Sequence, residues 1–164
     1  MLRSLDSCHE ALISWGVGTF HSDCRVRIGA MKEKSCATVL VVDDFPEWRS
    51  RIRETLLSRP EWKVIAEASD GEEAVYKASE YRPDIILLDI GLPKLNGIEA
   101  ARRIRQSCPH HAHIVFITQE GDQDIRDAAL GIKGTHYLMK SNAASELVPA
   151  IASALAARNT AALD

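Results

Sequence analysis

Side chains able to bind a metal ion or a phosphoryl group stand directly after short, largely apolar runs at four places in the chain. A carboxylate in such a place can be a metal ligand, a nucleophile or a helix cap, depending on what lies near it. The residues and the runs that precede them are Asp43 and Asp44 after Val39–Val42, Asp89 after Ile85–Leu88, Thr118 after 114–117, and Lys140 after 135–139.

Three of these residues are carboxylates, which would repel one another strongly if the fold brought them together. A hard divalent cation relieves that repulsion, and ligands that are all oxygen favour Mg²⁺ or Mn²⁺. With Lys140 as a point charge and Thr118 as a hydroxyl donor, the set could neutralise a transferring phosphoryl group. Asp89, which stands alone, is then the best candidate to accept that group, whereas Asp43 and Asp44 form a ready metal-binding pair.

Each of the five residues also has a simpler interpretation. An Asp-Asp pair ahead of a helix can cap that helix and meet its dipole, and a lone aspartate such as Asp89 is common in turns. Threonine is common at strand ends, and a lysine is more often solvated than functional. A shared function becomes the better interpretation if all five residues lie at the carboxyl ends of neighbouring strands.

Short strands and amphipathic helices alternate along the chain from residue 38 onward. The run Ile85–Leu88 is β-branched in part and does not alternate with polar residues, which is typical of a strand buried on both faces. Pro46 opens the first helix, and Pro60 requires it to end. Pro149 predicts that regular helix in the last element begins only near Ser145. The remaining predicted strands are 39–42, 62–66, 114–117 and 135–139, and the later helices begin near Gly71 and Gly97 or span 121–132 and 142–157.

Strands that alternate with helices predict a parallel sheet covered on both faces, with right-handed crossovers. For five such units we expect an α/β fold of the flavodoxin-like (βα)5 type, a three-layer sandwich around a five-stranded parallel sheet of order 2-1-3-4-5. In that order the first and third strands are central neighbours, so Asp43, Asp44 and Asp89 converge at their carboxyl ends. The fourth and fifth strands bring Thr118 and Lys140 to the same edge.

The region from about residue 36 to residue 158 resembles the receiver domain of two-component response regulators. The spacing of the site residues fits that family, with intervals of 45, 29 and 22 residues between Asp44, Asp89, Thr118 and Lys140. The segment 140–147 is most similar to the NarL/FixJ-type subgroup. The segments that carry the resemblance are 41–44, 87–93 with Asn96-Gly97, 116–118 and 137–141.

The resemblance implies that Asp89 accepts a phosphoryl group from a sensor histidine kinase or a phosphotransfer protein. It implies that Asp43, Asp44 and Asp89 hold Mg²⁺ (or Mn²⁺), with the backbone carbonyl of Gly91 as a further ligand. Lys140 and Thr118 would bind the phosphoryl oxygens. Tyr137 matches the family's switch aromatic, whose rotamer changes when Thr118 is drawn to the phosphate and so reshapes the face made by the fourth helix, fifth strand and fifth helix.

Two residues beside the predicted site are expected to modulate it. Gln119 follows Thr118, where the family usually has a small residue, so its longer side chain could narrow access to Asp89 or hydrogen-bond the phosphoryl group. Glu120, like Gly91, stands where the family is variable and is expected to influence the lifetime of the aspartyl-phosphate. Farther along, Gly134 is the expected left-handed residue at the exit of the fourth helix.

The 164-residue chain has the composition of a soluble globular protein, with 46% hydrophobic and 26% charged residues. Its net charge of −3 argues against direct binding of nucleic acid. No apolar run approaches the roughly 20 residues that cross a membrane, and no signal peptide is recognisable. The four irregularly spaced cysteines favour a reducing cytoplasm over a disulfide framework.

We expect three regions: an N-terminal extension of unknown role at 1–35, a receiver domain at 36–158, and a tail or the start of a linker at 159–164. Met31 resembles a natural start just ahead of the first strand. The receiver either acts alone through protein contacts, a homodimer among them, or belongs to a transcriptional regulator whose output domain is missing.

A regulatory phosphoacceptor is expected rather than an enzyme. Phosphatases that use an aspartyl-phosphate typically place a second acid two residues after the nucleophile, where this chain has Gly91. A flavin-binding module on the same fold would need an anion-binding loop after the first strand, whereas Asp43 and Asp44 repel phosphate there unless a metal ion intervenes.

Overall fold

The computed structural model describes residues 36–108, 112–119 and 121–161, with side chains up to residue 156 in the last helix. The chain divides into two units, Met1–Glu33 and Lys34–Asp164, and the described residues all belong to the second. The predicted N-terminal extension and Glu120 lie outside the described residues, so the expectations for them remain predictions.

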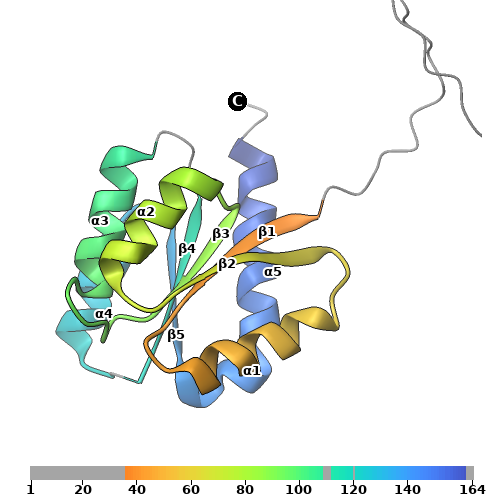
Figure 1. Cartoon of the computed structure of the whole chain (residues 1–164), viewed down its shortest axis with the longest axis horizontal. Coiled ribbons are helices and arrows are strands. Elements are labelled where there is room, and N and C mark those ends of the chain that lie inside the picture. Colours follow the sequence, from red (N-terminus) through yellow and green to blue (C-terminus); the bar gives the residue numbers. More distant parts are fainter. Residues whose placement is uncertain (1–35, 109–111, 120, 162–164) are drawn as a thin grey trace, which may run out of the picture. The chain divides into compact units, whose positions relative to one another are not determined.

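Five strands alternate with five α-helices in the described part of the chain, and a single 3₁₀ turn precedes the last helix (Figure 1). In chain order the elements are β1 (Ala37–Val42), α1 (Pro46–Leu57), β2 (Trp62–Ala68), α2 (Gly71–Tyr81), β3 (Ile85–Leu88), α3 (Gly97–Ser107), β4 (His113–Thr118), α4 (Gln123–Leu130), β5 (Thr135–Met139), the 3₁₀ turn Lys140–Asn142, and α5 (Ala143–Ala161).

The strands form one sheet of order β2-β1-β3-β4-β5, and every neighbouring pair is parallel. This topology confirms the predicted flavodoxin-like arrangement. All four residues of β3 are buried, as expected for the central strand of a sheet covered on both sides.

Helices cover both faces of the sheet, and each face has its own apolar cluster (Figure 1). On one side α2, α3 and α4 pack over side chains such as Leu40, Ile86 and Phe116. On the other side α1 and α5 pack over Val41 and Leu87 among others. Because successive side chains of a strand point to opposite faces, each central strand contributes to both clusters.

Two helices begin at side-chain caps and at glycines that allow close packing. The side chain of Asp70 accepts a hydrogen bond from the backbone of Glu73 and caps α2, and Asn96 caps α3 in the same way. A Cβ atom on Gly97 would lie 2.0 Å from the backbone oxygen of Asp89, so only glycine lets α3 start this close to the end of β3.

The helix boundaries differ from the predicted ones at α4 and α5. Helix α4 is shorter than the predicted span 121–132, because Asp122 has extended backbone angles and caps the helix, which ends before Gly131. Helix α5 begins at Ala143 and passes through Pro149, so the prediction of a start near Ser145 was wrong. Buried Leu147 and Ile151 on either side of this exposed proline anchor the helix and offset the hydrogen bond lost at Pro149.

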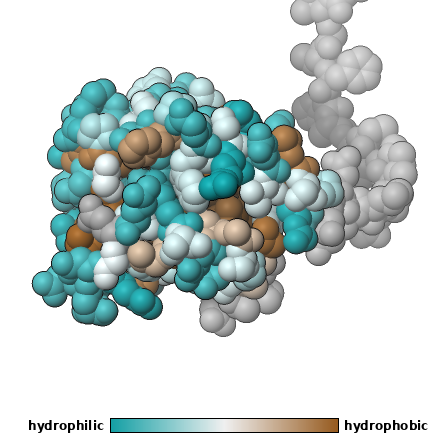
Figure 2. Space-filling view, turned by 90° about the horizontal axis from the view of Figure 1, so that it is seen from below, coloured by the Kyte–Doolittle hydropathy of each residue, from teal (hydrophilic) through white to brown (hydrophobic). Residues whose placement is uncertain are grey.

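The face seen from below in Figure 2 is mostly hydrophilic, with hydrophobic residues gathered in smaller groups between the polar ones. Within the described residues, none of the helices combines the length and the apolarity needed to cross a lipid bilayer.

Candidate functional site

The ends of β1 and β3 place the predicted aspartates beside one another. Val42 is paired with Leu88, and the backbone N–H of Asp89 donates to the Val42 carbonyl at 3.0 Å. Asp43 and Asp89 therefore leave neighbouring strands at the same level. Carboxylate oxygens of Asp43, Asp44 and Asp89 all lie within 4.8 Å of one another.

The ends of β4 and β5 bring the predicted hydroxyl and ammonium groups to the same edge. Thr118 is the last residue of β4 and pairs with Met139, so Lys140 follows directly beyond the pair. Both side chains are buried, with Thr118 at 1% exposure and Lys140 at 8%. The register thus gathers all five predicted residues at one edge of the sheet.

The Asp89 carboxylate is held by backbone and side-chain donors. Its Oδ1 accepts hydrogen bonds from the backbone N–H of Ile90 at 2.7 Å and of Gly91 at 3.3 Å. Its Oδ2 accepts a hydrogen bond from Lys140 Nζ at 2.6 Å. These contacts fix the orientation of the carboxylate at the end of β3.

Lys140 bridges two of the three carboxylates. Its Nζ lies 2.6 Å from Asp43 Oδ2 and 2.6 Å from Asp89 Oδ2. Burial by itself would lower the pKa of Lys140, but the hydrogen bonds to Asp43 and Asp89 and their negative charges outweigh burial and raise it. The side chain therefore carries its positive charge at neutral pH.

Burial dominates at Asp43 and raises the pKa of its carboxyl group, although the hydrogen bonds from Lys140 and from the backbone N–H of Phe45 act in the opposite direction. Arg49 of α1 donates to the backbone carbonyl of Asp43 at 2.6 Å and forms an ion pair with Glu67 of β2 at 3.1 Å. Burial thus disfavours the ionised form of Asp43, and a bound cation would stabilise that form.

Asp44 provides the clearest sign that this edge suits a metal ion. Its Oδ1 is buried and has no hydrogen-bond partner in the described part of the chain. The N-cap of α1 is Phe45, and no side chain makes its capping bond, so the Asp-Asp pair does not cap this helix in that sense, although Asp43 accepts a hydrogen bond from the backbone N–H of Phe45. Three converging carboxylates with one unsatisfied buried oxygen fit a hard divalent cation such as Mg²⁺.

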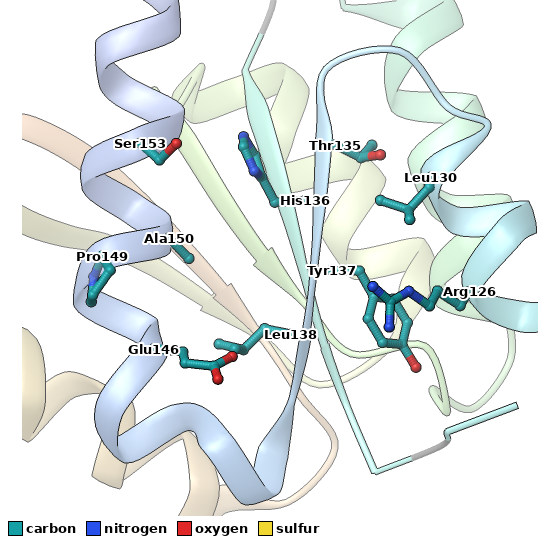
Figure 3. Close-up of a pocket in the computed structure, with 10 residues that line it drawn as sticks. All are labelled: Arg126, Leu130, Thr135, His136, Tyr137, Leu138, Glu146, Pro149, Ala150 and Ser153. Carbon is teal, nitrogen blue, oxygen red and sulfur yellow. The ribbon is translucent and has the colours of Figure 1, made fainter. Parts of the chain in front are cut away.

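The two predicted switch residues are Thr118, at the end of β4, and Tyr137, on β5. Tyr137 is half-buried, its hydroxyl lies 3.6 Å from Met139 Sδ, and the guanidinium of Arg126 stacks 5.5 Å from its ring centroid. Figure 3 shows Tyr137 beside Arg126 on the α4 side of β5, whereas His136 and Leu138 point toward α5. Gln119 is exposed, and Gly134 has a φ of 74°, which confirms the predicted left-handed residue.

Sequence reasoning missed several neighbours of the site. Phe45 and Trp48 place their rings near Lys140, and neither was among the predicted site residues. Outside the site itself, Lys94 in the loop after β3 has a φ of 63° and forms an ion pair of 2.6 Å with Asp70, the N-cap of α2. The position of Phe45 directly after Asp44 was the one available signal, because contacts with Lys140 depend on the tertiary fold.

The chain matches the family model of the response regulator receiver domain over residues 39–152. It is 33% identical over 113 residues to the transcriptional regulatory protein DegU of Brevibacillus brevis, covering 69% of this chain and 48% of the relative. It is 31% identical over 126 residues to the nitrate/nitrite response regulator protein NarL of Escherichia coli (strain K12), covering 77% of this chain and 58% of the relative.

Among solved structures, the fold is similar to that of a two-component response regulator of the LuxR family from Aurantimonas sp. SI85-9A1. The TM-score is 0.70 at 37% sequence identity, covering 75% of this chain and 87% of the other. The chain spans about half the length of the DegU and NarL relatives. The matched family model, the strand order and the converging aspartates lead to one conclusion. The chain belongs to the response regulator receiver domains of two-component systems.

Proposed function

We propose that this receiver is a phosphoacceptor, in which Asp89 takes a phosphoryl group from the phosphohistidine of a sensor histidine kinase or a phosphotransfer protein. Asp43, Asp44 and Asp89, with the backbone carbonyl of Gly91, would hold Mg²⁺ (or Mn²⁺). The observation that carries the proposal is the convergence of three carboxylates within 4.8 Å of one another beside the buried ammonium of Lys140.

In the transfer, a carboxylate oxygen of Asp89 forms a bond to phosphorus while the bond from phosphorus to the donor's imidazole nitrogen breaks. The electron pair stays on that nitrogen, which leaves the histidine neutral once any proton has equilibrated. The backbone N–H groups of Ile90 and Gly91 orient the attacking carboxylate. Lys140 and the hydroxyl of Thr118 supply positive charge and a hydrogen bond to the phosphoryl oxygens.

When bound, Mg²⁺ offsets the negative charge of the carboxylates and the phosphoryl group. The raised pKa of Asp43 and the unsatisfied oxygen of Asp44 support this part of the proposal. Gln119 and Glu120 would modulate entry to Asp89 and the lifetime of the aspartyl-phosphate. The chain would catalyse only its own phosphorylation and dephosphorylation, so we expect no turnover of a generic phosphate ester.

Phosphorylation would reach partners through the α4–β5–α5 face. Thr118 is drawn toward the phosphoryl group, and Tyr137 moves with it. The ring of Tyr137 lines a groove of about 400 Å³ between α4, β5 and α5, together with Arg126 and His136 (Figure 3). A change of the Tyr137 rotamer would alter the shape and charge of that groove.

We propose a receiver at residues 36–158, preceded by an extension of unknown role at 1–35 and followed by a tail or linker start at 159–164, in which α5 continues as far as Ala161. We propose a cytoplasmic location and an output that uses protein contacts, a homodimer among them, rather than direct binding of nucleic acid by these residues. The receiver is either independent or part of a transcriptional regulator.

Mass spectrometry after incubation with acetyl phosphate tests the phosphoacceptor directly. With Mg²⁺ present, we expect the wild-type chain and the control Asp127→Asn, which changes an exposed aspartate of α4, to gain about one phosphoryl group. Asp89→Asn should gain none, and chelation of the metal should prevent the gain in the wild type and in Asp127→Asn. Labelling of the wild type at a different residue, or no labelling at all, would overturn the proposal.

A further inference from the structure

The ammonium of Lys140 lies between two carboxylates and two aromatic rings. Its Nζ is 5.7 Å from the ring centroid of Phe45 and 5.4 Å from that of Trp48. Phe45 is the N-cap of α1 and Trp48 lies in its first turn, whereas Lys140 begins the 3₁₀ turn that follows β5. A cation within about 6 Å of a ring face is attracted to it, more strongly when water is excluded, and the Lys140 side chain is only 6% exposed.

The two rings differ in what else they do. Trp48 packs against the apolar cluster beneath α1, so the core also accounts for its presence. Phe45 is 55% exposed and belongs to neither apolar cluster. Since an exposed phenylalanine contributes little to the core, its contact with Lys140 is the feature that distinguishes it.

The carboxylates that hold Lys140 are also the groups that the phosphoacceptor reaction requires for other purposes. Asp43 would be drawn toward the metal ion, and at Asp89 the charge of the carboxylate is replaced by that of the phosphoryl oxygens, which lie at a different position. The attraction between the ammonium and the rings does not depend on either event. Lys140 must therefore exchange carboxylate partners for phosphoryl oxygens, and the rings can hold its ammonium in place during that exchange.

We infer that Phe45 and Trp48 are positioning residues, whose rings keep the Lys140 ammonium beside Asp89 while metal binding and phosphorylation exchange its carboxylate partners for phosphoryl oxygens. This inference rests on the proposed phosphoacceptor function. Phe45 carries the sharper test, because replacing an exposed side chain leaves the core intact.

The matched variants are Phe45→Leu, which keeps an apolar side chain without a ring, and Phe45→Tyr, which restores the ring. Phosphorylation by acetyl phosphate is followed over a range of donor concentrations at saturating Mg²⁺, since a small donor needs no docking partner. We expect Phe45→Leu to lower the plateau rate constant about three- to tenfold with little change in the half-saturating donor concentration. Phe45→Tyr should remain within about twofold of the wild type, and Trp48→Phe should be milder than Trp48→Leu.

Measuring Phe45→Leu in a Lys140→Met background distinguishes two roles of the Phe45 ring: positioning Lys140, or acting at the entrance of the site. If the ring acts through Lys140, Phe45→Leu has no further effect in that background. The inference would be overturned if Phe45→Leu lowered the rate equally with and without Lys140, or if Phe45→Leu alone caused no loss. Labelling of the wild type would still support the phosphoacceptor function in either case.

An NMR measurement tests the positioning even if no labelling is seen. The rings should shift the Lys140 side-chain methylene protons to high field in the wild type and in Phe45→Tyr, and less so in Phe45→Leu. The shift should persist when Mg²⁺ and beryllofluoride, a phosphoryl analogue, are added. A wild-type chain without this shift, or one that loses it on addition of the analogue, would contradict the inference. Absence of labelling alone would instead remove the proposed function.

Discussion

At the scale of single residues, Asp44 links stability to metal binding. Its buried Oδ1 has no hydrogen-bond partner in the described residues, and two further carboxylates lie nearby. Without metal, Asp44→Asn should therefore raise the free energy of unfolding by about 0.5–1.5 kcal/mol, because it removes repulsion between like charges. Urea denaturation with and without Mg²⁺ measures both effects.

Magnesium at a hundred times its dissociation constant should stabilise the wild type by about 2.7 kcal/mol and leave Asp44→Asn nearly unchanged. Asp127→Asn, on the exposed surface of α4, serves as the control and should respond to Mg²⁺ like the wild type. Equal stabilisation of Asp44→Asn and wild type would remove Asp44 from the set of metal ligands.

The convergence of the five main site residues could be predicted from the sequence, since each follows an apolar run that ends at the same sheet edge. The pairing of Lys140 with Asp43 and Asp89 could not be read in that way. That pairing depends on the distance between strands that are separated in the chain, and local patterns do not encode such distances. The same reason explains why Phe45 and Trp48 were missed as neighbours of Lys140.

At the scale of elements, the glycine at the start of α3 controls the position of Asp89. A Cβ on Gly97 would lie 2.0 Å from the backbone oxygen of Asp89, whereas a Cβ on Gly121 would meet only the end of the Met139 side chain at 3.4 Å. Gly97→Ala should therefore lower the free energy of unfolding by about 1–3 kcal/mol and slow labelling by acetyl phosphate. Gly121→Ala is the control and should change neither by much.

Thermal unfolding and labelling rates together check this prediction. A Gly97→Ala protein as stable and as rapidly labelled as the wild type would show that α3 can move away from β3 without disturbing the site.

The cap of α2 gives a second test at this scale, with a dependence on pH. The backbone N–H of Glu73 and the ammonium of Lys94 lower the pKa of Asp70. A lowered carboxyl pKa contributes stability that is present above the unfolded value, near 3.8, and is lost as the pH falls through the lower folded value. Asp70→Ala should cost about 1 kcal/mol at pH 7, whereas Asp70→Asn keeps a capping oxygen and should cost less.

Urea denaturation at pH 7 and pH 3 measures the effect. The stability difference between wild type and Asp70→Asn should narrow at the lower pH, where the ionised form of Asp70 is being lost. A difference that stays constant would assign the role of Asp70 to capping alone, without a contribution from its charge.

Element positions were more predictable than element ends. The bounds of β3 and β5 agree with the prediction, because apolar runs and turn residues delimit both strands. The ends of α4 and α5 were missed, since Asp122 extends the backbone before α4 and packing holds Pro149 inside α5. Local breakers such as proline are overridden where neighbouring buried residues fix the helix.

At the scale of the whole molecule, the site and the α4–β5–α5 face are connected through β4 and β5. Thr118 pairs with Met139 and Phe116 pairs with Tyr137, so the site residue and the groove residue lie on adjacent strands. If Thr118 transmits the signal, beryllofluoride with Mg²⁺ should change the amide NMR signals of residues 123–139 as well as those around Asp89.

Thr118→Ala should confine those changes to the neighbourhood of Asp89, and Thr118→Ser, which retains the hydroxyl, should restore the wild-type pattern. Changes that reach α4 in Thr118→Ala would show that the hydroxyl is not needed to connect the site with that face.

The fold as a whole followed from the alternation of strands and helices, which fixes a parallel sheet with few alternative orders. The alternation could not predict the groove beside Tyr137, because the shape of the groove depends on side chains from α4, β5 and α5 together.

The distribution of the site over the chain has a consequence for protein synthesis. A ribosome translates Asp43, Asp44 and Asp89 well before it reaches Lys140, the residue whose charge holds two of them. A nascent chain lacking β5 therefore contains the acidic half of the site without its ammonium. Because parallel strand pairs distant in sequence form slowly, we expect the site to be completed late, after synthesis of β5 and during the final steps of folding.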